Sequence, residues 1–178
     1  MFGELVMKVS FLLLIISAAT IHAQEGRLIR NPIRNIPKAV RNEFTAQHLD
    51  DRYTITYQLY PYYLKGDFNG DERRDIAIPI SDKASGKAGI AIFHGKKPQA
   101  LNTQVVIVSA GKPLGKAGDD IRWVNFWNVD KRKSRSLEMA DKSIQTLKTD
   151  ALIVGRRDST SGMIYWDGKK YAWSKLKK

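Results

Sequence analysis

The sequence predicts a mainly β (α+β) domain, with an antiparallel sheet of about seven to nine strands and a short helix on its N-terminal side. Two observations support this class. Residues 53–60 alternate through β-branched and aromatic side chains, a pattern typical of a strand. Beyond residue 60, short apolar runs are separated by segments rich in Gly, Ser, Asp and Lys, which favour turns between strands.

The next two predicted strands are residues 75–80 and 89–93, joined by the turn-rich segment SDKASGKA. Pro79 lies inside the first of them and has no amide donor, so we expect an edge position or a bulge there. Further strands are predicted at residues 103–109, 121–128, 151–154, 163–166 and 171–174. The last two flank Asp167-Gly168, which is a strong signal for a hairpin turn.

Two short helices are predicted. Pro37 suits the first turn of a helix, and the segment that follows it, KAVRNEFTAQHL, is amphipathic. Val40, Phe44 and Leu49 fall near one face of that helix. The segment LEMADKSIQTL, residues 137–147, predicts the second helix.

The first 23 residues of the 178-residue chain are predicted to be a signal peptide. Residues 9–21 are almost wholly apolar and end in small residues, and cleavage is expected after Ala23. This run is too short to span a bilayer, which takes about 20 apolar residues. We therefore expect an exported protein, periplasmic or secreted, without a transmembrane segment in its mature chain. A start at Met7 would place Lys8 directly before the apolar run, as a signal peptide prefers.

Residues 24–36 are polar and aperiodic, and we expect an extended arm or linker there. Residues 37–178 then form a single β-rich domain, long enough to bury a core. The chain contains no cysteine, so disulfides cannot hold its loops in an oxidising compartment. A bound cation could hold them instead.

The chain is strongly basic, with a formal charge of +12 and a pI near 9.9. Such a charge favours adhesion to anionic partners, such as an anionic polysaccharide, an envelope surface or phospholipid. Because the protein is expected to be exported, nucleic acid is not an expected partner. The alternative is a solvated basic surface that only keeps the protein in solution.

One loop has a specific chemical meaning. It offers oxygen atoms at positions 1, 3, 5, 7 and 9: Asp67, Asn69, Asp71, the backbone carbonyl of Arg73, and Asp75. Calcium takes about six to eight oxygen ligands, and a short loop supplies them when oxygen-bearing residues alternate along it. Gly70 permits the tight curl between ligands. The spacing therefore predicts a Ca²⁺ site, and the alternative is an Asp/Asn/Gly turn that binds no metal.

The loop does not have the EF-hand pattern. Glu72 and Ile78 occupy the positions where that motif needs Gly and a bidentate Glu, and a β-type run follows instead of a helix. The segment GDFNGDERRDIAI, residues 66–78, instead resembles the FG-GAP/VCBS-type repeats of β-propellers. In those repeats a GDFNGD loop binds calcium between the strands of a blade, and Asp with an apolar strand follows.

The resemblance implies Ca²⁺ binding, propeller-blade-like hairpins and, more weakly, a role in adhesion. It covers one repeat, and a propeller needs at least four blades of about 40 residues, so we do not expect a full propeller. The repeats usually place Gly after the third ligand, where a left-handed backbone is needed. Glu72 stands at that position here, at a cost of about 1 kcal/mol of strain.

Two segments of the chain resemble each other. Residues 75–97 and 150–171 both run from Asp through an apolar strand, a polar turn with Ser-Gly and a second apolar strand to Gly-Lys-Lys. This similarity predicts two related hairpins in one sheet, the second without a carboxylate loop. Chance similarity between hairpins is the alternative.

No catalytic motif is present in the sequence. It has no Gly-x-Ser-x-Gly, no His-Glu-x-x-His and no cysteine, and Ala117 stands where a P-loop would need Ser or Thr. His48 and His94 are expected to be capping or surface residues. The pair Asp119-Asp120 is expected in a turn or cap, and a cleft that joined it to His94 would favour an enzyme.

Aromatic residues are the other candidates for recognition. Five tyrosines precede the carboxylate loop, and four tryptophans follow it: Tyr53, Tyr57, Tyr60, Tyr62, Tyr63, Trp123, Trp127, Trp166 and Trp173. Exposed, they would stack on sugar rings, whereas buried they would be core. A core role is the expected one.

The function expected from these features is that of an exported, calcium-stabilised, β-rich binding or structural module of the cell envelope. One alternative is an envelope glycan-acting hydrolase, or an inhibitor of such a hydrolase, with a basic face that grips an anionic glycan. A scaffold or adhesion partner is a further alternative.

Overall fold

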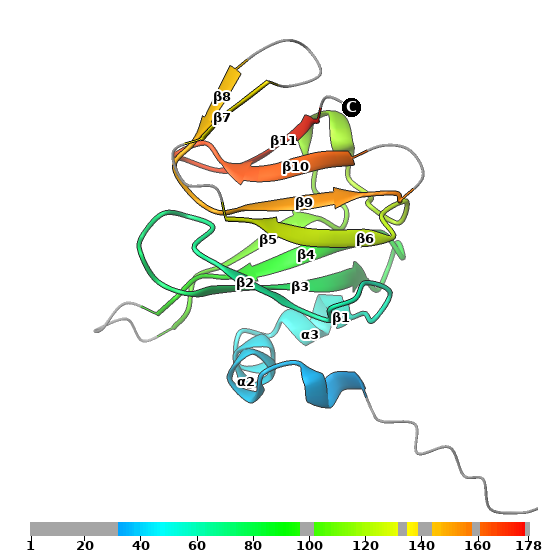
Figure 1. Cartoon of the computed structure of the whole chain (residues 1–178). Coiled ribbons are helices and arrows are strands. Elements are labelled where there is room, and N and C mark those ends of the chain that lie inside the picture. Colours follow the sequence, from blue (N-terminus) through cyan, green and yellow to red (C-terminus); the bar gives the residue numbers. More distant parts are fainter. Residues whose placement is uncertain (1–31, 97–101, 132–134, 139–143, 158–160, 177–178) are drawn as a thin grey trace, which may run out of the picture. The chain divides into compact units, whose positions relative to one another are not determined.

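The protein was analysed as a computed structural model, which describes residues 32–96, 102–131, 135–138, 144–157 and 161–176 (Figure 1). The expected signal peptide and the first part of the expected arm, residues 24–31, lie outside this range. The compact unit begins at Pro32, because a 3-10 turn at Pro32–Asn35 and the buried Ile36 precede the first α-helix. Within the described residues, no helix has the length and apolar character needed to cross a bilayer.

The fold is mainly β, as predicted, and all its strand pairs are antiparallel. The helices are α2 (Lys38–Ala46) and α3 (Leu49–Arg52), with a further 3-10 turn at Gly115–Ala117. The strands are β1 (Tyr53–Ile55), β2 (Leu64–Gly66), β3 (Asp75–Asp82), β4 (Ala88–Phe93), β5 (Val105–Ser109), β6 (Phe126–Asp130), β7 (Arg135–Glu138), β8 (Ile144–Leu147), β9 (Ala151–Gly155), β10 (Ser161–Trp166) and β11 (Tyr171–Lys175).

These strands form two principal sheets and not the one sheet that was predicted. The first sheet has the order β1-β3-β4-β5, with β2 also paired to β3, and the second has the order β11-β10-β9-β6. Strands β7 and β8 form a separate hairpin. The two similar segments of the sequence do form hairpins, β3–β4 and β9–β10, but these lie in different sheets.

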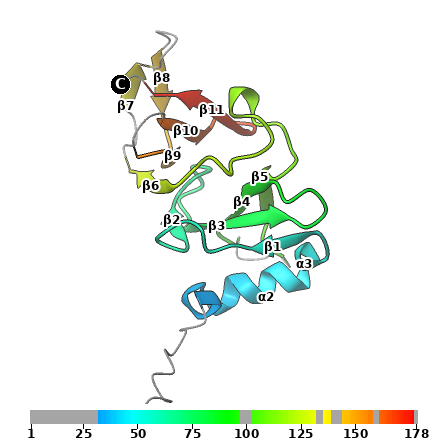
Figure 2. The same ribbon diagram turned by 90° about the vertical axis from the view of Figure 1, so that its right-hand side faces the viewer.

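The two sheets and the N-terminal helix pack as layers (Figures 1 and 2). The core between the sheets contains residues of both, such as Ile90 and Ile92 from the first and Leu152 and Val154 from the second. The other face of the first sheet packs against α2. The first sheet is therefore buried on both sides, and β4 is buried at every position from Ala88 to Phe93.

Helix α2 forms where it was predicted, because its apolar residues share one face. Val40 and Phe44, one turn apart, are both 4% exposed and pack on the first sheet, with Pro37 at the N-cap. The predicted helix at residues 137–147 is wrong, since its described parts are the strands β7 and β8. Pairing between strands decides this structure, and the local helix propensity of LEMADKS does not.

Pro79 lies inside the first sheet and not at its edge, which corrects the prediction. It faces Ile90 of β4 on one side, while on the other side β1 ends its pairing at Ile80 and β2 begins at Ala77. The carbonyl of Pro79 accepts a hydrogen bond from Thr56 N at 2.9 Å, just beyond the end of β1. The amide that proline lacks would therefore point into the gap between two strands, where no ladder partner is required.

Asp82 joins the β3–β4 turn to helix α3. Its carboxylate accepts hydrogen bonds from Arg52 Nε at 2.9 Å and from the amide and hydroxyl of Ser85, each at 2.9 Å. The Arg52 hydrogen bond, followed by those from Ser85, lowers the pKa of Asp82 from 3.8 to about 2. A depressed pKa means that this group stabilises the folded state above pH 4 and that the contribution is lost as the pH falls toward 2.

The variant Asp82→Asn is therefore expected to melt at a lower temperature than the wild type at pH 5, with the difference disappearing as the pH approaches 2. Thermal unfolding followed by circular dichroism between pH 2 and pH 6 measures this. Asp51→Asn is the control, because Asp51 lies beside Arg52 on helix α3 and its side chain is 76% exposed. A difference between wild type and Asp82→Asn that does not change with pH would contradict the assignment.

The carboxylate loop and its surroundings

The carboxylate loop connects two paired strands of the first sheet. Strand β2 pairs with β3, from Leu64 opposite Ala77 to Gly66 opposite Asp75, and the loop is the connection between these ends. Its backbone is left-handed at two positions, Gly70 with φ of 79° and Glu72 with φ of 64°. The resemblance to the repeats implied a left-handed backbone at Glu72, which bears strain there of about 1 kcal/mol.

Short local hydrogen bonds curl the loop. The carboxylate of Asp67 accepts the amides of Gly70 at 2.8 Å and Glu72 at 3.2 Å. Further along the loop, the side chain of Asn69 accepts the amide of Asp71, two residues ahead, at 3.1 Å. Asp71 in turn accepts the amide of Arg73 at 3.0 Å. The alternating spacing of these residues therefore has a direct structural consequence.

Asp75 is the most deeply buried member of the loop, with 0% exposure. One carboxylate oxygen accepts the amide of Phe68 and the other accepts the amide of Gly95, both at 2.7 Å. Burial raises the pKa of Asp75, although these two hydrogen bonds and His94 oppose that rise. Asp75 thus ties the start of the loop to the chain that leaves β4.

Asp71 lies nearer to the surface and behaves differently. Burial acts to raise its pKa, but the amide of Arg73, the side chain of Asn69 and the Arg73 guanidinium together hold the pKa below its usual value. The guanidinium nitrogen Nη1 of Arg73 is 3.5 Å from the Asp71 carboxylate. Asp71 is therefore expected to be ionised at neutral pH, as a cation ligand must be.

The loop also contacts the second sheet directly. The amide of Asp67 donates to the carboxylate of Asp150 at 3.0 Å, and the amide of Asp150 donates to the carbonyl of Asp67 at 2.9 Å. Phe68 is 1% exposed in the core shared by both sheets. A side chain at Gly70 would meet the methyl group of Thr149 at 2.8 Å. The loop therefore lies against the segment that leads into β9.

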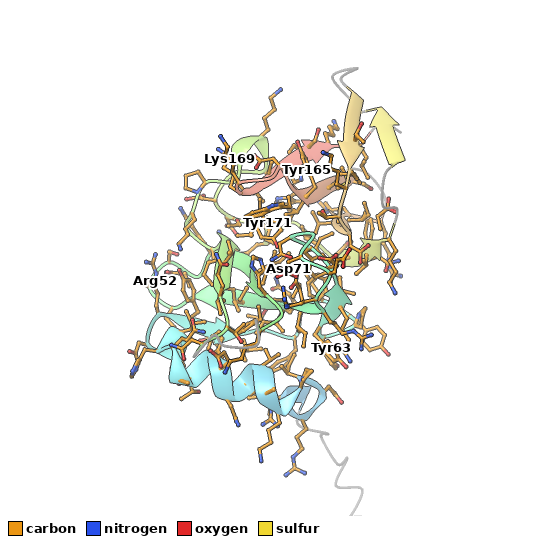
Figure 3. The ribbon with its side chains drawn as sticks, turned by 90° about the vertical axis from the view of Figure 1, so that its left-hand side faces the viewer. Arg52, Tyr63, Asp71, Tyr165, Lys169 and Tyr171 are labelled. Carbon is orange, nitrogen blue, oxygen red and sulfur yellow. The ribbon has the colours of Figure 1, made fainter. Side chains whose placement is uncertain are left out.

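A buried group that the sequence analysis missed borders the three aspartates. His94 Nε2 lies 2.9 Å from the hydroxyl of Tyr171, and Trp166 packs edge-to-face on both rings. Burial raises the pKa of Tyr171, and the carboxylates of Asp75, Asp67 and Asp71 raise it further. All three aspartates therefore lie within electrostatic reach of one hydroxyl, and Figure 3 shows Asp71 and Tyr171 at the level between the sheets.

His94 is buried, with 5% exposure, so the expectation of a capping or surface residue is wrong for it. The expectation is confirmed for His48, which precedes helix α3 and has a side chain that is 82% exposed. The second ring nitrogen of His94, Nδ1, has no hydrogen-bond partner among the described residues. Contacts with Trp166 and with Tyr171, which lies 77 residues further along the chain, explain this burial, and no local pattern predicts them.

The cleft that would have favoured an enzyme does not form. Asp120 accepts the amide of Ala88, at the start of β4, and Asp119 pairs with Lys87 at 2.5 Å. His94 follows the other end of β4, six residues away, which corresponds to about 20 Å along a strand. The two aspartates and the histidine therefore belong to opposite ends of the first sheet.

The tryptophans belong mostly to the core. Trp127 is 3% exposed and donates its indole N–H to the carbonyl of Pro61 at 2.7 Å. Trp123, Trp166 and Trp173 are partly buried against the core between the sheets. Among the described residues, Tyr60 is the large apolar residue that is exposed, at 80%.

The donor set of the loop suits a hard cation, since it consists of carboxylate, amide and carbonyl oxygens. Each carboxylate oxygen that accepts one backbone amide retains a lone pair for a second partner. Considering only His, Cys, Asp and Glu side chains of the described residues, no group of three or more is arranged to hold a metal ion. Asn69 and the Arg73 carbonyl lie outside that count.

Comparison with known proteins does not assign the chain to a family. No protein-family model matches it, and no curated protein or solved structure shows significant similarity to it. The assignment of the candidate site therefore rests on its geometry and on the GDFNGDERRDIAI segment alone.

The different burial of Asp75 and Asp71 predicts different costs of removal when no metal is present. In EGTA, Asp75→Ala leaves a buried amide, that of Phe68, and a half-buried one, that of Gly95, without an acceptor and should lower the free energy of unfolding by about 3 kcal/mol or more. Asp71→Ala exposes one amide near the surface and should cost about 1 kcal/mol or less. Urea denaturation measures both, and equal costs would contradict the structural role given to Asp75.

Proposed function

We propose that this protein is an exported, calcium-stabilised binding or structural module of the cell envelope. The observation that carries the proposal is the position of the carboxylate loop, which is bonded both to the first sheet, through Asp75, and to the second, through Asp150. A cation held there would order the loop and the junction of the sheets together. In a chain without cysteine, this is a way to stabilise an exported domain.

The residues that would hold the ion are the side chains of Asp67, Asn69, Asp71 and Asp75 with the carbonyl of Arg73. Calcium would supply positive charge beside three aspartates whose field already acts on Tyr171. Phe68, at 1% exposure between the ligand residues, anchors the loop in the core and limits its movement. The bound ion would thus act on stability, and the loop contains no group placed for catalysis.

The strand order also supports the resemblance to propeller blades. In the first sheet β2, β3, β4 and β5 are neighbours in chain order, and in the second β6, β9, β10 and β11 are neighbours in the same way. The β7–β8 hairpin is an insertion between β6 and β9. We propose that each set of four strands is a blade-like unit and that Asp75 and Asp150 occupy equivalent positions at the starts of β3 and β9. The metal loop would then belong to the first unit alone.

The charge of the chain supports a role in binding at the envelope. The formal charge of +12 favours an anionic surface or polysaccharide as the partner. A hydrolase role has no comparable support, because His94 is buried and Asp119 and Asp120 lie at the other end of β4.

Calcium that binds only the folded state raises its stability by RT ln(1 + [Ca²⁺]/Kd), about 2.7 kcal/mol at a hundredfold excess over Kd. We therefore expect the metal-loaded protein to lose several degrees of melting temperature in EGTA. Asp71→Ala should melt lower than the wild type in calcium and should no longer respond to EGTA. Differential scanning fluorimetry with and without EGTA measures both effects.

Asp119→Ala is the matched control, since it removes a carboxylate that pairs with Lys87 away from the loop. It should respond to EGTA as the wild type does. If EGTA leaves the melting temperature of metal-loaded wild type unchanged, the loop does not bind calcium and the proposal fails.

A further inference from the structure

Two adjoining hollows lie beside the carboxylate loop. The larger, of about 740 Å³, lies along β6 and is lined by Tyr60, Phe126, Asn128 and Arg157 among others. The smaller, of about 460 Å³, lies over the loop and is lined by Lys65, Arg74 and Asp67 among others. Lys131 lines both hollows, so they adjoin. Sites for small ligands commonly have volumes of about 300–1,000 Å³.

The larger hollow presents an aromatic ring to solvent. Tyr60 is 80% exposed, and its ring packs edge-to-face on Tyr62 at 5.7 Å, which packs in the same way on Tyr57 at 5.8 Å. The hydrogen bond from Trp127 to the carbonyl of Pro61 holds the next residue of the chain. Tyr60 is therefore held in place by its neighbours while it stays available to a ligand.

The smaller hollow and the junction contain several cations without an ion pair in the part of the chain that the structure describes. Arg74 and Lys131 have no ion pair with any carboxylate among the described residues, and neither has Arg157 at the far end of the larger hollow. Three carboxylates line the smaller hollow, those of Asp67, Glu72 and Asp150. Asp67 and Asp150 already accept backbone amides. Over the two hollows together, five lysine and arginine side chains stand against four carboxylates, of which Asp130 is the fourth. The three cations without an ion pair are thus available to a ligand.

We propose that these hollows, defined as the Tyr60–Lys131 groove, bind a strand of an acidic polysaccharide. The apolar face of a sugar ring would stack on Tyr60, the side chain of Asn128 would bond hydroxyl groups, and the acidic groups would pair with Lys131, Arg74 and Arg157. This inference rests on the proposed role in envelope binding and names its ligand class. An aromatic platform that alternates with unpaired cations fits a polymer with both sugar faces and acidic groups.

Binding of fluorescently labelled hyaluronan octasaccharide, heparin octasaccharide and neutral maltooctaose to the full chain tests this. Fluorescence anisotropy at low and physiological salt measures Kd. We expect the acidic sugars to bind more tightly than maltooctaose. Hyaluronan carries only carboxylates and heparin also carries sulfates, so these two probes distinguish the acidic groups. Tyr60→Ala should weaken binding about tenfold, whereas Tyr60→Phe, which keeps the ring, should stay close to wild type. Lys131→Ala should weaken binding and reduce its dependence on salt.

Lys169→Ala is the matched control for charge. Lys169 is exposed in the β10–β11 turn and lines neither of the two hollows. It should bind the acidic sugars as the wild type does. Thermal unfolding checks that Tyr60→Ala, which removes an exposed ring, keeps its fold.

Equal loss in Lys169→Ala and Lys131→Ala, or unchanged binding in Tyr60→Ala, would show adhesion through general charge and overturn the groove. Tighter binding of an oligothymidylate than of either acidic sugar would overturn the sugar class. A calcium effect on melting without binding of any acidic sugar would reject this inference alone. If binding depends on Tyr60 but EGTA does not change the melting temperature, the groove is supported and calcium binding by the loop is rejected.

Discussion

The structure depends on one buried carboxylate. Asp75 is fully buried and accepts the amides of Phe68 and Gly95 at 2.7 Å. One bond fixes the start of the loop and the other fixes the chain beyond β4. Because Phe68 packs in the core common to both sheets, holding its amide also holds the loop against the second sheet. Loss of this acceptor would free the loop and the end of β4 together.

Local features of the loop could be predicted from the sequence, because the forces that shape them act over two or three residues. Asn69 and Asp71 each accept the amide two positions ahead, as such side chains do in turns, and Glu72 takes the left-handed backbone that the resemblance implied. The pair formed by Asp67 and Asp150 could not be predicted in this way, because 83 residues separate them. Tertiary contacts of this length leave no periodic signal in the chain.

The division into two sheets could not be predicted for a related reason. Alternation of polar and apolar residues tells which face of a strand is buried, but β4 is buried at every position and carries no such signal. The similar segments beginning at Asp75 and Asp150 predicted two hairpins correctly, but they carried no information on which sheet each hairpin joins. The β7–β8 hairpin was mistaken for a helix because short segments are decided by their partners, and those partners are remote in sequence.

Acidic and basic residues around the loop play opposite roles at different depths. The carboxylates of Asp67, Asp71 and Asp75 act together on the buried hydroxyl of Tyr171, so a negative field extends between the sheets. Unpaired cations such as Arg74 and Lys131 lie around the hollow above. A divalent ion in the loop would offset the inner charge and leave the outer cations more attractive to an anion. Stabilisation of the domain and binding of an acidic ligand would then reinforce each other, because the same loop forms the floor of the hollow.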